Sequence, residues 1–190
     1  ATKIINSTPN LKLSTLSKNY FTSVNYSTQF IDHTQHLIKD IFKLNLYDFS
    51  NHYIIDTKCG AGIDVWKQLT ASAIGKFTWL NDQFSPDFNF KLPDPTSHET
   101  LSELSQLCTQ TNSVAFSNDP DADRHVMVDE NGEKVSPEKL AAIIIHYCIK
   151  EDILIDSIST TLANSVLVKK ICKKYNIKCH ETKIGFKYFS

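Results

Sequence analysis

The chain has 190 residues, which is enough for one large domain or two small ones. Apolar residues make up 41% and charged residues 22%, so the composition is that of a globular protein and not of a disordered chain. The formal net charge of -1 leaves no basic excess for a nucleic-acid backbone, and apolar runs such as 141–145 are too short to cross a bilayer. The five cysteines are spread along the chain without a CxxC pair, which favours free thiols over disulfides or a zinc site. We therefore expect a soluble, cytoplasmic protein with no nucleic-acid or membrane partner.

Residues 1–18 are rich in Ser, Thr, Asn and Lys and indicate a linker or the end of a preceding domain. Beyond them, hydrophobic periodicity alternates between the helical and the strand type. The helices expected from it cover 27–42, 64–74, 96–108, 136–150 and 164–175. The strands expected cover 53–56, 77–80, 114–117, 125–128, 153–158 and 178–182. Strands alternating with helices of about ten residues or more predict an α/β fold, with a boundary near Ser136.

Local signals mark three of the helix boundaries. Gly75 is placed to end the helix before it in a left-handed conformation. Thr96 and Glu99 have the spacing of a capping box at the start of the next helix. Ser136 followed by Pro137 predicts another helix start, because proline is favoured at the first helical position.

The loop 117–124 has the most informative composition in the chain. Asp119, Asp121 and Asp123 alternate at the carboxyl end of an apolar strand, a spacing that lets their carboxylates converge on one point. Three negative charges so close repel one another, and a hard divalent cation such as Mg²⁺ relieves this while keeping positions open for water or phosphate. Arg124 follows directly, and its planar guanidinium suits a phosphate bound to the same metal. The carboxyl edge of the sheet is also where α/β domains place their ligands.

Two other interpretations of this loop are open. It can be a solvated acidic turn between two strands. It can also be a calcium loop, because the three aspartates stand at positions one, three and five and Glu130 at position twelve. Against calcium, Arg124 occupies position six where glycine is needed, Pro120 occupies position two, and the flanks are strands.

Four segments are similar to motifs of one known family. Segment 119–124 (DPDADR) resembles the metal-binding loop of the α-D-phosphohexomutases, which include phosphoglucomutases and phosphomannomutases. Segment 55–62 (IDTKCGAG) resembles the glycine turn that opens the family's second domain, and 86–95 resembles the stretch ahead of its metal loop. Segment 181–187 (ETKIGFK) resembles the third-domain loop. The order and spacing of all four match, and the resemblance covers nearly the whole chain after the first 20 residues or so.

The resemblance implies a mixed β-sheet sandwiched by helices, followed by a truncated domain of the same type. It divides the chain into three parts. Residues 1–18 are a linker or the end of a missing first domain, 19–136 are the second domain with the Mg²⁺-binding loop, and 137–190 are the N-terminal part of the third domain.

The resemblance also implies an activity, that of an intramolecular phosphotransferase (isomerase). The family interconverts sugar 1-phosphates and distal phosphates, at the 6- or 5-position, through an enzyme phosphoserine and a bisphosphorylated sugar. The implied partners are therefore a hexose or pentose phosphate and its bisphosphate intermediate, and the implied cofactor is Mg²⁺. Carried over by position, Asp119, Asp121 and Asp123 are the metal ligands and Arg124 contacts the phosphate on the serine. Lys187 matches a lysine that stabilises charge or donates a proton, with an exposed surface lysine as the alternative.

Some family features do not occur in the chain. It has no phosphoserine loop of the Ser-His-Asn-Pro type, and the sugar-reading loop and fourth domain would lie beyond Ser190. Lys183 and Ile184 replace residues that are frequent in relatives, which leaves the contacts made there open. We therefore expect a fragment of the enzyme that is inactive when taken alone. The alternative is a short, non-catalytic module of the same fold that binds a metal or a phosphosugar, and a preference for Mg²⁺ or Ca²⁺ distinguishes the two.

Overall fold

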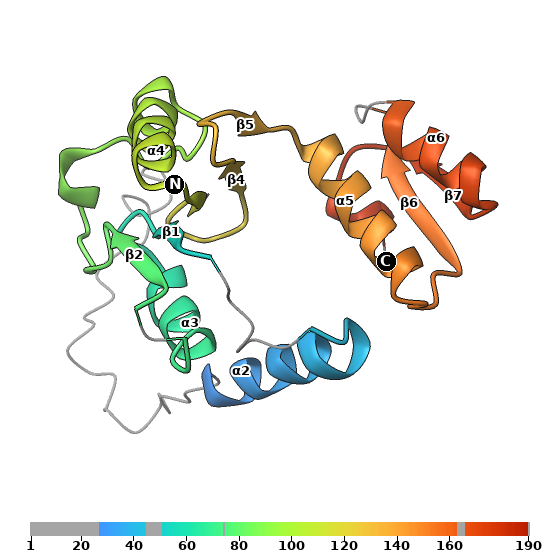
Figure 1. Cartoon of the computed structure of the whole chain (residues 1–190), viewed down its shortest axis with the longest axis horizontal. Helices are drawn as coiled ribbons and strands as arrows, with labels where there is room; N and C mark the ends of the chain where they lie inside the picture. Colours follow the sequence, from blue (N-terminus) through green and yellow to red (C-terminus); the bar gives the residue numbers. More distant parts are fainter. Residues whose placement is uncertain (1–26, 45–50, 74, 163–165, 190) are drawn as a thin grey trace, which may run out of the picture.

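The computed structural model describes residues 27–44, 51–73, 75–162 and 166–189, so the expected linker over 1–18 lies outside it. The strands are β1 (Tyr53–Asp56), β2 (Phe77–Leu80), β3 (Val114–Asn118), β4 (His125–Val128), β5 (Lys134–Val135), β6 (Ser157–Thr161) and β7 (Lys178–Thr182). The helices are α2 (Ser27–His36), α3 (Gly62–Leu69), α4 (His98–Thr111), α5 (Pro137–Lys150) and α6 (Val166–Tyr175), with a π-helical turn (Leu37–Ile41) and two 3₁₀ turns (Phe88–Phe90, Phe186–Tyr188). Figure 1 shows two lobes, joined where the chain passes from β5 into α5. None of the helices in the described ranges has the length and apolar character that a membrane span requires.

A five-stranded mixed sheet forms the first lobe, with the strand order β2-β1-β3-β4-β5. β1 pairs in parallel with both β2 and β3, whereas β3 with β4 and β4 with β5 are antiparallel pairs. The chain leaves β1 toward β2 on one side and then crosses to β3 on the other, so the strand order reverses between β1 and β3. The carboxyl ends of these two strands meet at one edge, where Asp56 lies beside Ser117.

The two faces of this sheet are covered by different helices. On one face α4 packs over a buried cluster, which consists of Ile54, Leu104, Cys108, Ala115, Val126 and Val128. Neighbouring residues of a strand point to opposite faces, and on the second face the Phe116 ring stacks on Trp66 of α3, with 6.3 Å between the ring centroids. Figure 1 shows α4 and α3 on opposite sides of β1 and β2. The predicted fold class, a mixed sheet between helices, is confirmed.

The second lobe is built on the parallel pair β6 and β7 with α5 and α6. Its buried cluster consists of Ile145, Val168 and Cys172. α5 begins as the sequence predicts, because Ser136 Oγ accepts the Lys139 N–H at 3.3 Å and proline follows directly. The Tyr147 hydroxyl donates to the Phe42 carbonyl at 2.8 Å and joins α5 to the end of the π-helical turn.

The predicted end of the helix over 64–74 is wrong. α3 ends at Leu69, because the chain turns at Thr70, whose hydroxyl donates to the Trp66 carbonyl at 2.8 Å. Gly75 does adopt a left-handed conformation, with φ +80°, but it lies beyond the helix in the turn before β2.

The predicted capping box at the start of α4 is also wrong. Both the N–H and the hydroxyl of Thr96 donate to Asp94 Oδ1, at 2.9 and 2.8 Å, which forms an Asx turn. The helix cap is Ser97, whose Oγ accepts the Thr100 N–H at 3.2 Å.

The strand predicted over 153–158 begins later than expected. The Ile153 N–H donates to the Cys148 carbonyl at 2.8 Å, which closes the end of α5, and the residues up to 156 are irregular. The apolar Ile155 still packs against the buried cluster of this lobe, so its hydrophobicity reflects core packing rather than strand pairing.

Candidate metal centre

The acidic loop joins β3 to β4 at the carboxyl edge of the sheet. Asp119, Asp121 and Asp123 each offer a carboxylate oxygen, and these oxygens lie within 4.8 Å of one another. Ala122 has φ +61° and donates its N–H to the Asp119 carbonyl at 3.0 Å, so the chain reverses tightly between the aspartates. Asp119 is buried, with 1% of its surface exposed, whereas the other two aspartates are exposed. The structure thus brings the three predicted ligands to one point that solvent reaches.

Arg124 holds the buried carboxylate from the other end of the loop. Its Nε donates to Asp119 Oδ2 at 2.7 Å, and its backbone N–H donates to Oδ1 at 3.0 Å. Burial by itself would raise the pKa of Asp119, but these bonds and the charge of the guanidinium lower it overall. The same contacts raise the pKa of Arg124. Asp119 is therefore kept ionised although it is buried.

The exposed part of the loop carries uncompensated negative charge. The charge of Asp121 is the main cause that raises the pKa of Asp123, and burial and Asp119 add to it. The guanidinium of Arg124 lies 3.8 Å from Asp123 Oδ1 and cannot neutralise all three carboxylates. A cation bound between the three would relieve this repulsion.

The donor set fits Mg²⁺. Three carboxylates supply hard oxygen ligands and leave positions for water or phosphate oxygens. The loop joins β3 to β4, whereas a calcium hand needs a helix on each side of its loop, so the calcium alternative does not match the observed flanks.

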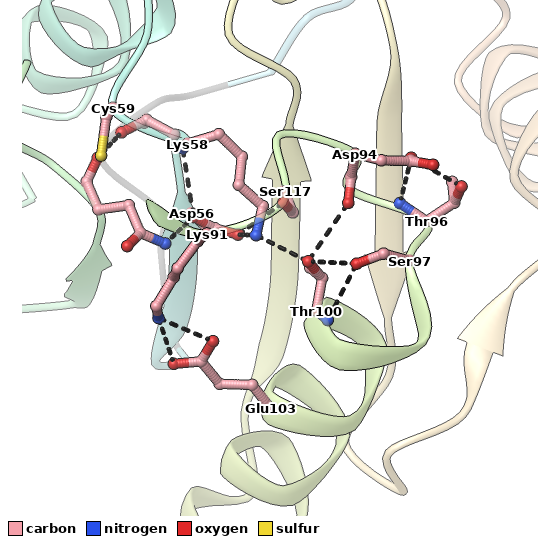
Figure 2. A network of polar contacts seen from close by, with 12 residues as sticks. Asp56, Lys58, Cys59, Lys91, Asp94, Thr96, Ser97, Thr100, Glu103 and Ser117 are labelled. Carbon is pink, nitrogen blue, oxygen red and sulfur yellow. Dashed lines mark hydrogen bonds and ion pairs between the residues drawn. The ribbon is translucent and has the colours of Figure 1, made fainter. Parts of the chain in front are cut away.

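Figure 2 shows a buried polar network at the carboxyl ends of β1 and β3, which the sequence analysis did not predict. Its centre is Asp56 at the end of β1, which is 1% exposed. Asp56 Oδ2 accepts the Ser117 hydroxyl at 2.7 Å and lies 3.0 Å from the Lys58 ammonium, while Oδ1 accepts the Asn81 amide at 2.7 Å. The Lys58 ammonium also donates to Thr100 Oγ1 at 2.8 Å. The network therefore connects the ends of β1, β2 and β3 to the first turn of α4.

The same network reaches the acidic loop through the start of α4. The Thr100 hydroxyl lies 3.3 Å from the Asp94 carbonyl, to which it donates. The Asp94 side chain lies 3.9 Å from Arg124 Nη1. The N–H and hydroxyl of Thr96 are the largest causes that lower the pKa of Asp94. Asp94 is thus a third carboxylate beside the guanidinium, in addition to Asp119 and Asp123, and this proximity was not predictable from the sequence.

Lys187 belongs to the second lobe and not to the mixed sheet. It lies in the 3₁₀ turn Phe186–Tyr188 after β7, where its side chain is exposed and its ammonium stands 5.2 Å from the centre of the Tyr188 ring. The predicted site residues are therefore divided. Three aspartates and Arg124 form one cluster, and the lysine comes from the other lobe.

Two family models match the chain. The model described as "Phosphoglucomutase/phosphomannomutase, alpha/beta/alpha domain II" matches residues 28–132, and the corresponding domain III model matches residues 136–190. Together they contain all five predicted site residues.

Similar proteins carry related names. A probable phosphoglucosamine mutase from Methanocella arvoryzae is 27% identical over 165 residues, which cover 86% of this chain and 35% of that protein. A phosphoglucomutase from Komagataeibacter xylinus is 25% identical over 146 residues, covering 71% of this chain and 26% of that protein. Among solved structures, a phosphoglucomutase/phosphomannomutase family protein from Burkholderia thailandensis has a TM-score of 0.72 at 15% identity, covering 88% of this chain and 35% of that one, which shows the fold. The chain thus spans about a third or less of the length of these proteins.

Proposed function

Because the chain belongs to the phosphoglucomutase/phosphomannomutase family, we propose that it is the part of a phosphohexomutase that supplies the Mg²⁺ site. The observation that carries the proposal is the convergence of three carboxylates, within 4.8 Å of one another, beside Arg124. The named relatives are a phosphoglucosamine mutase and a phosphoglucomutase, which supports a hexose phosphate as the substrate of the intact enzyme. A pentose phosphate as the alternative substrate, and the bisphosphate intermediate, belong to the proposal through the family resemblance. A reducing, cytoplasmic location belongs to the same proposal and is supported by five free thiols.

Each residue of the cluster has a role in this proposal. Asp119, Asp121 and Asp123 hold the ion, which when bound offsets the negative charge on a transferring phosphoryl group. Arg124 uses its Nε and backbone N–H on Asp119, and its side chain is 60% exposed, so its remaining donors can bind a phosphate oxygen. Lys187 stabilises charge or donates a proton from the second lobe.

The phosphoryl donor of the proposed reaction is a phosphoserine outside this sequence. The chain has no loop of the Ser-His-Asn-Pro type. We therefore propose that the isolated chain binds Mg²⁺ but does not interconvert sugar phosphates.

Mg²⁺ titration by isothermal calorimetry tests the metal site directly. The wild-type chain should bind one ion, and Asp121→Asn should abolish binding because it removes a ligand charge. Asp121 is the better target than Asp119, since Asp119 is buried and bonded to Arg124, so its loss would also disturb the loop. Asp156→Asn, an exposed carboxylate in the other lobe, is the control and should bind as the wild type does. Unchanged binding in Asp121→Asn would refute the site, and tighter binding of Ca²⁺ than of Mg²⁺ would favour the non-catalytic binding module.

A further inference from the structure

The turn after β1 rests directly on the acidic loop. The Ala61 N–H donates to the Pro120 carbonyl at 2.7 Å. At Gly60 there is no room for a side chain, because a Cβ there would lie 2.2 Å from the Pro120 carbonyl oxygen and 2.4 Å from its Cα. Pro120 stands between Asp119 and Asp121, so its position sets the positions of both carboxylates.

This turn is held by its own backbone. Lys58 and Cys59 both adopt left-handed conformations, with φ +47° and +57°. The Cys59 N–H donates to the Asn81 carbonyl at 2.8 Å, and the Gly60 N–H donates to the Thr57 carbonyl at 3.0 Å. Left-handed residues persist only where the surrounding structure fixes them, so the turn is a defined surface rather than an adaptable one.

The side chain of Lys58 anchors the turn to the interior. It is 2% exposed, its ammonium lies 3.0 Å from Asp56, and it donates to Thr100 at 2.8 Å. Shifting the turn away from the acidic loop would separate this buried pair, which is costly because an unpaired buried charge remains. When a side chain is introduced at Gly60, the exposed acidic loop is therefore the partner that moves.

We propose that Gly60 is a positioning residue for the proposed Mg²⁺ site. Because Gly60 has no side chain, the rigid turn 57–61 can pack directly against the backbone of Pro120. This contact fixes the position of Pro120 and therefore the separation of the carboxylates on either side of it. This inference rests on the proposed Mg²⁺ site. The turn would thus affect metal affinity although it is far from the aspartates in sequence.

Two nearby glycines, Gly60 in the turn and Gly62 at the first position of α3, give a matched pair of variants. Gly60→Ala places a Cβ against the Pro120 backbone. Gly62→Ala is the control, because a Cβ there meets its nearest heavy atom, in the Trp66 ring, at an ordinary 3.5 Å, and neither glycine has a left-handed φ. Mg²⁺ affinity is measured by calorimetry on the full 190-residue chain, with circular dichroism and urea unfolding in the absence of metal. We expect Gly60→Ala to fold and to bind Mg²⁺ roughly 10- to 100-fold more weakly, the range seen when residues supporting metal ligands are changed. Gly62→Ala should bind as the wild type does.

The outcomes separate this inference from the proposed function. If the wild-type chain binds Mg²⁺ and folded Gly60→Ala binds it equally well, the positioning role is refuted and the metal site stands. If the wild-type chain does not bind Mg²⁺, both fail.

A measurement on the wild-type chain covers the case in which Gly60→Ala does not fold. Saturating Mg²⁺ should slow hydrogen exchange at the Ala61 amide, since that N–H donates to the metal loop. Exchange at Ala61 that is unaffected by Mg²⁺ would overturn the proposal.

Discussion

Arg124 and Asp119 form an ion pair that has one partner inside the protein and one outside. Nε of Arg124 lies 2.7 Å from Asp119 Oδ2, and the side chain of Asp119 is 2% exposed while that of Arg124 is 60% exposed. The arginine thus compensates a buried charge from the solvent side. A metal ion that binds the same carboxylate would supply positive charge to it as well.

This arrangement predicts that the effect of Arg124→Gln on stability depends on Mg²⁺. Without metal, the substitution removes a bond to a buried carboxylate and should lower the free energy of unfolding. In saturating Mg²⁺ the loss should be smaller, because the ion compensates the same charge. Urea unfolding with and without Mg²⁺ measures both values, and an equal loss in the two conditions would contradict the expectation.

The buried pair of Asp56 and Lys58 predicts a large cost when one partner is removed. Lys58→Met should lower the free energy of unfolding by about 3–5 kcal/mol, because the Asp56 carboxyl group would remain buried without its partner. The double variant Asp56→Asn/Lys58→Met should be more stable than Lys58→Met alone. Lys91→Met is the control, since Lys91 pairs with Glu103 at 3.2 Å but both side chains are over a third exposed, and it should cost less than about 1 kcal/mol. Equal unfolding free energies for Lys58→Met and Lys91→Met would show that the buried pair is not stabilising.

We expect truncation of Leu104, the buried leucine of α4, to lower the stability of the chain. Leu104 is 1% exposed and packs against the β-sheet, so Leu104→Ala should cost about 2–5 kcal/mol through lost burial and the cavity that remains. Leu154→Ala removes the same atoms from a side chain that is 85% exposed and should cost no more than about 0.5 kcal/mol. Chemical denaturation measures the free energy of unfolding of both variants. Similar losses of stability in the two would show that Leu104 is not a core residue.

We expect ionisation of the buried Cys108 thiol to lower the stability of the chain at alkaline pH. Burial raises its pKa from 9.0 to about 11, so the folded chain keeps a proton that the unfolded chain has already lost. The contribution of the protonated Cys108 thiol to the free energy of unfolding is fully present below pH 9.0 and is lost as the pH rises toward about 11. In that window Cys108→Ala should reduce the slope of unfolding free energy against pH, by at most about 1.4 kcal/mol per pH unit. Unfolding curves at several pH values check this, and identical slopes for the variant and the wild type would disprove it.

Features that depend on neighbouring residues were predictable from the sequence alone. The strand β1, the start of α5 at Ser136 and the convergence of the aspartates all follow from residues within a few positions of one another. A capping hydroxyl or an alternating carboxylate acts over one turn of chain, so its spacing carries the information.

Local competition between such signals was harder to predict. Thr96 and Ser97 can both cap a helix. Ser97 is the cap, because the N–H and the hydroxyl of Thr96 are both bonded to Asp94. Ile153 and Ile155 have the residue type of a strand, yet the closure of α5 keeps them out of the sheet. In each case both neighbouring sequence patterns are valid signals, and a local hydrogen bond decides between them.

Only the tertiary structure shows the buried network and the contact between the turn after β1 and the acidic loop. Asp56 and Ser117 are far apart in sequence and meet because β1 and β3 pair in parallel, with Asp56 opposite Ser117. Gly60 matters for the aspartates because the same pairing lays the turn after β1 against Pro120. The sequence by itself determined which side chains can bind a cation, since that depends on their own chemistry and spacing. What holds them at the right separation depends on strand register, which is set by the burial of both faces of the sheet and is therefore a property of the whole fold.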